Sequence, residues 1–289
     1  MRKGIIQKLT MLAFVAMVGI PAFAQGGKFG TNAGVATTIG EGHQAGDVFD
    51  LEELQYRVID IESGLNLEVI GFASYISGAT GDPTLLESKY AGTVTIPHYL
   101  DPAVVDVAAH VSSVAANAFT TTVLYPTAPG NSADSKDQFA AAAARVTKLE
   151  IDYSPTEITA AIGANAFAGL TALTQVQNFT PGDKVLGIPS NSFSSVTYKK
   201  TLTVPEGSVN GYQTKSGWKR FLGVYDGTVL YGDVDGNGVI NMLDYKKLLT
   251  AVKGGTTSSL GTGADVNGKA PINMLDYKLL LNKVKGVDF

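Results

Sequence analysis

Short stretches in which apolar and polar residues alternate occur between residues 49 and 230 of the chain. Every second residue is apolar in two of them, 54–58 and 65–69, and the segment DIESG separates the two. Alternation with a period of two places every second side chain on one face of a β-strand. We therefore predict an antiparallel β-hairpin whose first strand ends near Ile59, because Asp60 breaks the alternation.

A weaker pattern repeats after the hairpin. The strand-like segments TVTIP, at 93–97, and TLTVP, at 201–205, both close with proline. The segments VAANAF, IGANAF and IPSNSF each end in a phenylalanine, at Phe119, Phe167 and Phe193. These intervals suggest a unit of about 24 residues with one degenerate copy. One such unit cannot cover its own apolar side, so we expect an α/β-type repeat solenoid of short strands and turns around a continuous core.

The apolar spacing changes to that of helices near the C-terminus. The stripe residues are Tyr245, Leu248, Leu249 and Val252 in one stretch, and Tyr277, Leu280, Leu281 and Val284 in a second. Spacings of three, four and seven residues predict two amphipathic helices, which end at Gly254 and Gly286. Each helix follows a twelve-residue loop, DVDGNGVINMLD at 233–244 and DVNGKAPINMLD at 265–276.

The first loop has the register of an EF-hand calcium loop, with oxygen ligands at positions 1, 3, 5, 7, 9 and 12 and glycine at position 6. The candidate ligands are Asp233, Asp235, Asn237, the Val239 carbonyl, Asn241 and Asp244, with Gly238 at position 6. Calcium is a hard cation that prefers such an all-oxygen set. We predict calcium in this loop; the alternative is an acidic turn without metal.

The second loop departs from this pattern. It keeps Asp265, Asn267, the Pro271 carbonyl, Asn273 and Asp276 as candidate ligands. Lys269 replaces the ligand at position 5, and Ala270 replaces the glycine at position 6. An ammonium repels a cation unless it swings into solvent, and alanine resists a left-handed turn. We expect no calcium in this loop, with Lys269 neutralising its carboxylates instead.

Composition narrows the functional classes. Residues 1–24 combine basic residues, an apolar run and Ala22-Phe23-Ala24, which is typical of a secretory signal peptide. Residues 25–48 lack any period and predict a flexible leader. The chain has no cysteine, which excludes disulfides, thiolate catalysis and a lipoprotein anchor. Its formal net charge of −4 does not suit a nucleic-acid partner, and no further apolar run predicts a membrane span.

A catalytic arrangement is hard to assemble from this sequence. His43, His98 and His110 form no metal-binding pair by spacing, and the segment GNSADS around Ser132 lacks the second glycine of a nucleophile elbow. We therefore expect a protein that is not an enzyme.

The repeat region resembles a known family. The hairpin YRVIDIESGLNLEVIGF, the segment IGANAFAGLTALTQV and the segment LTVPEGSVNGYQTKSGWKRF are similar to the BspA-like leucine-rich repeats of exported Bacteroidetes proteins, the last of these to their terminal cap. This resemblance implies a leucine-rich-repeat-like domain over residues 49–230, although residues 120–145 depart from the repeat. The cap aromatics Tyr212, Trp218 and Phe221 either close the core or form a sugar-stacking platform.

The tail, residues 231–289, resembles a type I dockerin, which implies a small all-α domain with two EF-hand-like loop–helix units. This resemblance implies a cohesin-type partner at loop positions 10 and 11. These positions hold Met242, Leu243, Met274 and Leu275, and Lys246, Lys247 and Lys278 form a rim. The alternative is that the methionines and leucines fill the core between the helices.

These features favour a secreted, non-catalytic scaffold or binding protein that attaches through its calcium-loaded tail to a cohesin-like domain. One alternative is an adhesin for host or matrix proteins with the tail as a calcium-stabilised cap. The other is an accessory protein that binds polysaccharide.

Overall fold

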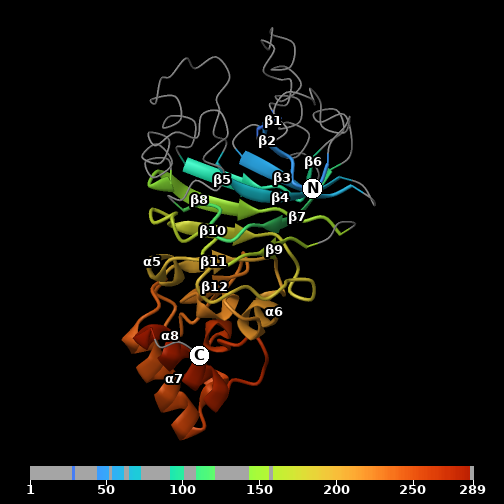
Figure 1. The fold of residues 1–289 in the computed structure, drawn as a ribbon. Helices are drawn as coiled ribbons and strands as arrows, with labels where there is room; N and C mark the ends of the chain where they lie inside the picture. The colour runs from blue at the N-terminus through green and yellow to red at the C-terminus, as the bar shows by residue number, and fades with distance from the viewer. Residues whose placement is uncertain are drawn as a thin grey trace.

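The computed structural model describes residues 28–29, 44–51, 54–61, 65–72, 92–100, 109–120, 143–155 and 159–286. Two β-sheets form the first part of the molecule, and two helices form its C-terminal end (Figure 1). The predicted signal peptide, His43 and Ser132 lie outside the described residues, as does the segment 121–142. No helix in the described ranges has the length and apolar character needed to cross a membrane.

The first sheet contains the predicted hairpin. Its strands are β1 (Lys28–Phe29), β2 (Val48–Leu51), β3 (Leu54–Asp60), β4 (Leu65–Phe72), β6 (Tyr99–Leu100), β7 (Ala109–Val114) and β9 (Ala161–Ile162). β3 and β4 pair antiparallel, and β3 ends one residue beyond the expected end, so the hairpin is confirmed. The leader is not wholly without structure: β1 lies within 25–48 and pairs antiparallel with β2.

The second sheet is mainly parallel. Its strands, in spatial order, are β13 (Leu230–Tyr231), β12 (Gly223–Tyr225), β11 (Thr201–Thr203), β10 (Gln175–Asn178), β8 (Val146–Ile151) and β5 (Gly92–Ile96). Only β13 runs antiparallel to its neighbour. One row of side chains crosses five strands in register and is fully buried: Val94, Leu149, Val176, Leu202 and Val224. The two proline-terminated segments are therefore strands β5 and β11 on the same core.

A second row of side chains runs through the turns. Phe119, Phe167 and Phe193 are buried, and their rings stack with centroids 5.6 and 5.0 Å apart. The asparagines two residues earlier form a ladder beside them. Asn165 Nδ2 donates to Asn117 Oδ1 at 3.2 Å, and Asn191 Nδ2 donates to Asn165 Oδ1 at 3.0 Å. The prediction that each turn ends in a buried aromatic is confirmed.

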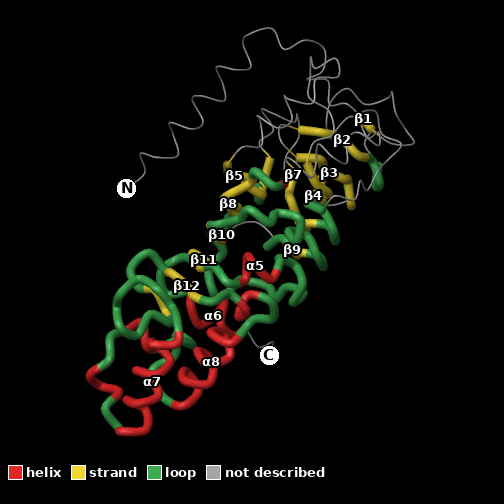
Figure 2. Tube along the Cα trace, turned by 90° about the vertical axis from the view of Figure 1, so that its left-hand side faces the viewer, coloured by secondary structure: helices red, strands yellow, loops and turns green. Residues whose placement is uncertain are grey.

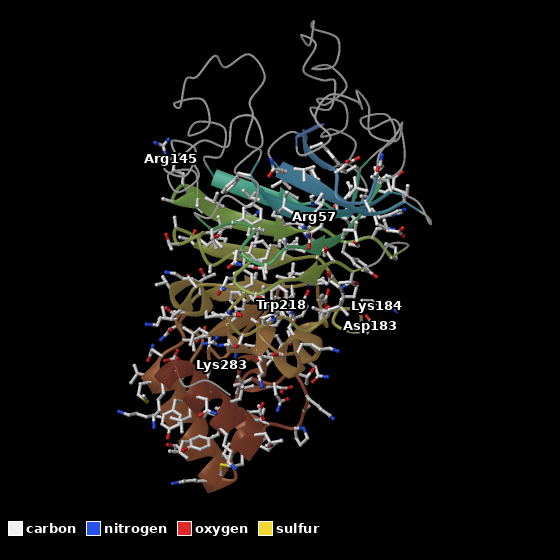
Figure 3. The ribbon with its side chains drawn as sticks, viewed as in Figure 1. Arg57, Arg145, Asp183, Lys184, Trp218 and Lys283 are labelled. Atoms are coloured by element: carbon white, nitrogen blue, oxygen red, sulfur yellow. The ribbon has the colours of Figure 1, made fainter. Side chains whose placement is uncertain are left out.

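Short helices close the core at its C-terminal end. They are α5 (Ser195–Tyr198), α6 (Val209–Thr214) and the 3-10 turn η1 (Trp218–Arg220). Tyr212, Trp218 and Phe221 are fully buried, and Trp218 points into the body of the molecule (Figure 3). The Tyr212 hydroxyl donates to the Thr180 carbonyl at 2.7 Å, and Trp218 Nε1 donates to the Leu186 carbonyl at 2.8 Å. These aromatics therefore close the core, and the sugar-platform interpretation is wrong.

The helical tail has its own small core. α7 (Met242–Gly254) packs against α8 (Met274–Lys285), and the 3-10 turns η2 (Thr257–Ser259) and η3 (Thr262–Ala264) connect them (Figure 2). Leu248 and Leu280 are fully buried at its centre. Leu249 and Leu281, which the helical spacing placed in the stripes, do not belong to this core. The predicted helix ends are confirmed, because Gly255 and Gly286 adopt the left-handed conformation that terminates each helix.

Candidate metal centre

The first loop curls around the carboxylate of Asp233. Its Oδ1 accepts hydrogen bonds from the backbone N–H groups of Gly236 and Asn237, at 2.9 and 3.1 Å, and its Oδ2 accepts one from Gly238 at 2.7 Å. Gly236 and Gly238 have φ values of +79° and +82°, which an L side chain would resist. The sequence therefore folds tightly enough here to bring successive polar side chains toward one centre.

Asp244 ties the loop to the helix that follows it. This fully buried carboxylate accepts backbone hydrogen bonds from Val234 and Asp235 through Oδ1, at 2.8 and 3.1 Å, and from Asn241 through Oδ2, at 2.8 Å. The side chain of Asn241 in turn accepts from the backbone of Leu243 at 2.7 Å, which completes a capping box. The same contacts that start α7 thus position the last candidate ligand of the loop.

Three of the predicted ligands converge in this loop. Carboxylate oxygens of Asp233, Asp235 and Asp244 all lie within 4.8 Å of one another, and no other trio of metal-binding side chains does so within the described ranges. The other donors share the loop: Asn237 Oδ1 accepts from the Val239 backbone at 2.8 Å, and the Val239 carbonyl accepts from Asn241 Nδ2 at 3.3 Å. Several carboxylates and neutral oxygens form the donor set that suits calcium, so the residues fit this ion.

The second loop repeats the scaffold with fewer charges. Asp276 is fully buried and accepts backbone hydrogen bonds from Asn267 and Asn273, at 3.1 and 2.9 Å. Asp265 Oδ1 accepts from the backbone of Lys269 at 2.8 Å, and the Pro271 carbonyl accepts from Asn273 Nδ2 at 2.6 Å. Burial raises the pKa of the Asp276 carboxyl and the negative charge of Asp265 adds to this rise, although the backbone hydrogen bonds oppose it.

Loop two departs from the calcium-loop pattern at Lys269 and Ala270, and the structure shows the effect of both. Ala270 does not adopt a positive φ, and its peptide bond to Pro271 is cis. The Lys269 side chain is exposed and forms no ion pair with a carboxylate of the described residues. Lys269 therefore does not neutralise the loop carboxylates as we expected; it extends into solvent. The loop offers two carboxylates where loop one offers three, so it fits calcium less well.

Residues 231–285 match the family model of the Dockerin type I domain. The helical tail is a type I dockerin domain. Dockerin domains of this type bind calcium and dock to cohesin domains, so the calcium inferred from the loop register is confirmed as the cofactor of this region. The assignment of individual ligands stays a prediction. The resemblance of residues 49–230 to BspA-like leucine-rich repeats is not supported by any match, and neither curated proteins nor solved structures gave a significant match to the chain.

The dockerin exposes an apolar pair at the start of each helix. The exposed fractions are 38% for Met242, 59% for Leu243, 41% for Met274 and 64% for Leu275. Lys246, Lys247 and Lys278 are exposed on the same helices. Leu248 and Leu280 fill the space between the helices instead. The alternative that the two exposed methionine–leucine pairs form the core is therefore wrong.

Two polar contacts have no signal in the sequence because they join residues more than 50 positions apart. His98 Nδ1 lies 2.8 Å from Asp152 Oδ2, and the His98 ring stacks on Tyr99. Lys283, on α8, is buried, and its ammonium donates to the backbone carbonyls of Lys219, at 2.9 Å, and Phe221. Figure 3 shows Lys283 at the junction between the helical tail and the cap formed by α6 and η1.

Burial of Lys283 makes the stability of the chain depend on pH. Desolvation of the ammonium lowers the pKa of Lys283 from 10.5 to about 7. Between these values the unfolded chain binds a proton that the folded chain does not, so the contribution of Lys283 to the free energy of unfolding rises with pH. We expect the wild type to gain stability over Lys283→Met from pH 7 to pH 10, by at most about 1.4 kcal/mol per pH unit. Denaturant titrations of both proteins across this range measure the difference, and a constant difference would contradict the assignment.

Proposed function

We propose that the chain is a secreted, non-catalytic scaffold or binding protein whose dockerin attaches residues 49–230 to a cohesin-type partner. The dockerin match over residues 231–285 carries this proposal. Dockerin proteins are typically extracellular or attached to cell surfaces, which agrees with the signal peptide expected at residues 1–24. The calcium ion in loop one, held by the six ligands predicted from its register, fixes the start of α7 and hence the partner surface.

The apolar pairs supply the partner surface in this proposal. Met242 and Leu243 begin α7, and Met274 and Leu275 occupy the same place on α8. Exposed apolar side chains rimmed by lysines have the composition of a protein interface, in which an apolar centre is surrounded by a polar margin. The two pairs follow equivalent capping asparagines, so each presents the same chemistry to a partner.

We further propose that residues 49–230 form a leucine-rich-repeat-like array that presents a second interaction surface. Support comes from the spacing of equivalent positions. Leu149 of β8 lies beside Val176 of β10, which follows it by 27 residues in the sequence. Val176 lies beside Leu202 of β11, which follows it by 26 residues. The asparagine ladder repeats after 48 and then 26 residues, close to two units and one unit. Repeats whose sheets stack in this way bury one shared core.

The docking proposal predicts a specific loss of binding. We expect the double variant Leu243→Ala/Leu275→Ala to bind an immobilised type I cohesin domain at least about a hundredfold more weakly than the wild type in millimolar calcium, because truncated anchors leave an apolar pocket unfilled. Surface plasmon resonance against a panel of purified type I cohesins measures this.

The control is Leu186→Ala, which truncates another exposed leucine, 43% exposed, outside the dockerin. Chelation of calcium should release the wild type from its cohesin. Retention of the cohesin in chelator, or by a chain cut after residue 230, would contradict the proposal.

A further inference from the structure

The dockerin and the sheet region share a strand. The family match begins at Tyr231, which lies in β13 and pairs with Val224 of β12. Ile240 of loop one closes this junction, because a Cβ built on Gly223 or Gly232 would lie 2.4 or 2.9 Å from its Cδ1 atom. No linker separates the two regions, and the cap formed by α6 and η1 lies directly beside the dockerin.

The cap contacts one half of the dockerin and not the equivalent place in the other half. Gly236 and Gly268 occupy the fourth position of loops one and two, and both have positive φ values, +79° and +68°. A Cβ on Gly236 would meet nothing within 4 Å, whereas one on Gly268 would lie 2.8 Å from the Asn210 backbone nitrogen and 2.9 Å from Val209 Cγ1. The backbone of loop two therefore rests against α6.

Of the two dockerin helices, α8 contacts the cap through Lys283, whereas α7 has a small buried residue at the equivalent position. Lys283 on α8 stands 32 residues after Ala251 of α7, the interval that relates the two loops. Ala251 is small and buried within the dockerin, whereas Lys283 reaches the carbonyls of Lys219 and Phe221 at the end of η1. The half of the dockerin that contacts the cap is also the half whose loop has Lys269 and Ala270 in place of a ligand and a glycine.

We propose that the cap formed by α6 and η1 takes the place of a second calcium ion. In this proposal the cap holds loop two and α8, and calcium binds only in loop one. Two fixed contacts, at Gly268 and at Lys283, restrain the beginning and the end of this second half. An ion restrains a loop by drawing its donors together, and a packed backbone with two satisfied carbonyls restrains it by excluding alternative conformations. The proposal rests on the assignment of loop one as a calcium site.

Calcium stoichiometry of the full chain is the first test. Isothermal titration with calcium chloride, together with native mass spectrometry, should give one ion per chain. Two ions of similar affinity would overturn the cap proposal and leave the docking function intact. Absence of any bound calcium up to millimolar concentration would overturn the assignment of loop one, and with it both proposals.

Hydrogen exchange of the full chain separates the two loops. When calcium is chelated, the amides of Asn237 and Gly238 in loop one should exchange at least about tenfold faster, whereas those of Asn267 and Lys269 in loop two keep their protection. Equal loss of protection in both loops would overturn the proposal.

The variant Lys283→Met should produce the reverse pattern in saturating calcium, with faster exchange in loop two and α8 and unchanged exchange in loop one. Lys285→Met, which replaces an exposed lysine of the same helix, is its control. Gly268→Ala should loosen the cap amides of residues 209–221, and Gly236→Ala, which imposes a comparable backbone strain without a neighbour, should not. Should Lys283→Met leave loop two as protected as the wild type, the cap does not hold it.

Discussion

Replacement of Asp233 by alanine is expected to raise the calcium dissociation constant of the chain by at least about a hundredfold, because calcium affinity depends steeply on the number of charged ligands and on loop rigidity. Asp233 contributes to both. It is one of three converging carboxylates, and it also accepts three backbone hydrogen bonds that hold the loop in its curled form. Isothermal titration of the full chain with calcium measures the change.

The matched control is Asp265→Ala, which removes the carboxylate at the same position of loop two. Asp265 belongs to no trio of converging carboxylates in the described part of the chain, so its loss should change the calcium affinity less than about threefold. If Asp265→Ala weakened calcium binding as much as Asp233→Ala, the ion would depend on both loops and the assignment of loop one as its sole site would be wrong.

The largest effect on stability is expected for Phe167→Ala. The ring of Phe167 is fully buried and stacks between Phe119 and Phe193, so its truncation opens a cavity that neighbouring rings cannot fill. Large-to-small changes of buried phenylalanine cost about 3–5 kcal/mol. We expect a loss of this size in the free energy of unfolding, measured by denaturant titration in excess calcium.

Phe179→Ala is the control for this change, because Phe179 is 39% exposed on the same region. Its truncation should cost less than about 1 kcal/mol, as surface substitutions generally do. Similar losses for the two variants would mean that the stacked row of phenylalanines is not a centre of stability.

The spacing of apolar residues was sufficient to predict the elements whose buried side is set by their own local sequence. The strands β5 and β11 and both dockerin helices are of this kind. The hairpin strands β3 and β4 follow their alternation only in part, because Gln55 and the run 69–72 are also buried. The loop register predicted the cluster of Asp233, Asp235 and Asp244 for a similar reason, since all the ligands lie in one twelve-residue segment.

The features that sequence reasoning missed depend on distant partners. The two-residue strands β1 and β13 are too short to carry a period, and pairing with β2 and β12 alone defines them. Lys283 is a lysine in the last turn of a helix, where such residues are ordinarily solvated. Its burial is decided by η1, more than 60 residues earlier in the chain. Helical spacing predicted that Leu248 and Leu249 are both part of the core. Only Leu248 is, because the contact between the two helices is too narrow to include both.

The shared strand β13 has a mechanical consequence. A flexible tether would let the sheet region tumble freely about the dockerin, but here the chain passes from sheet to dockerin within a paired strand. A partner bound to the dockerin would therefore fix the direction in which the sheet region projects. Tension between that partner and the sheet region would run through the β12–β13 pairing and the Lys283 contacts instead of first straightening a loose spacer.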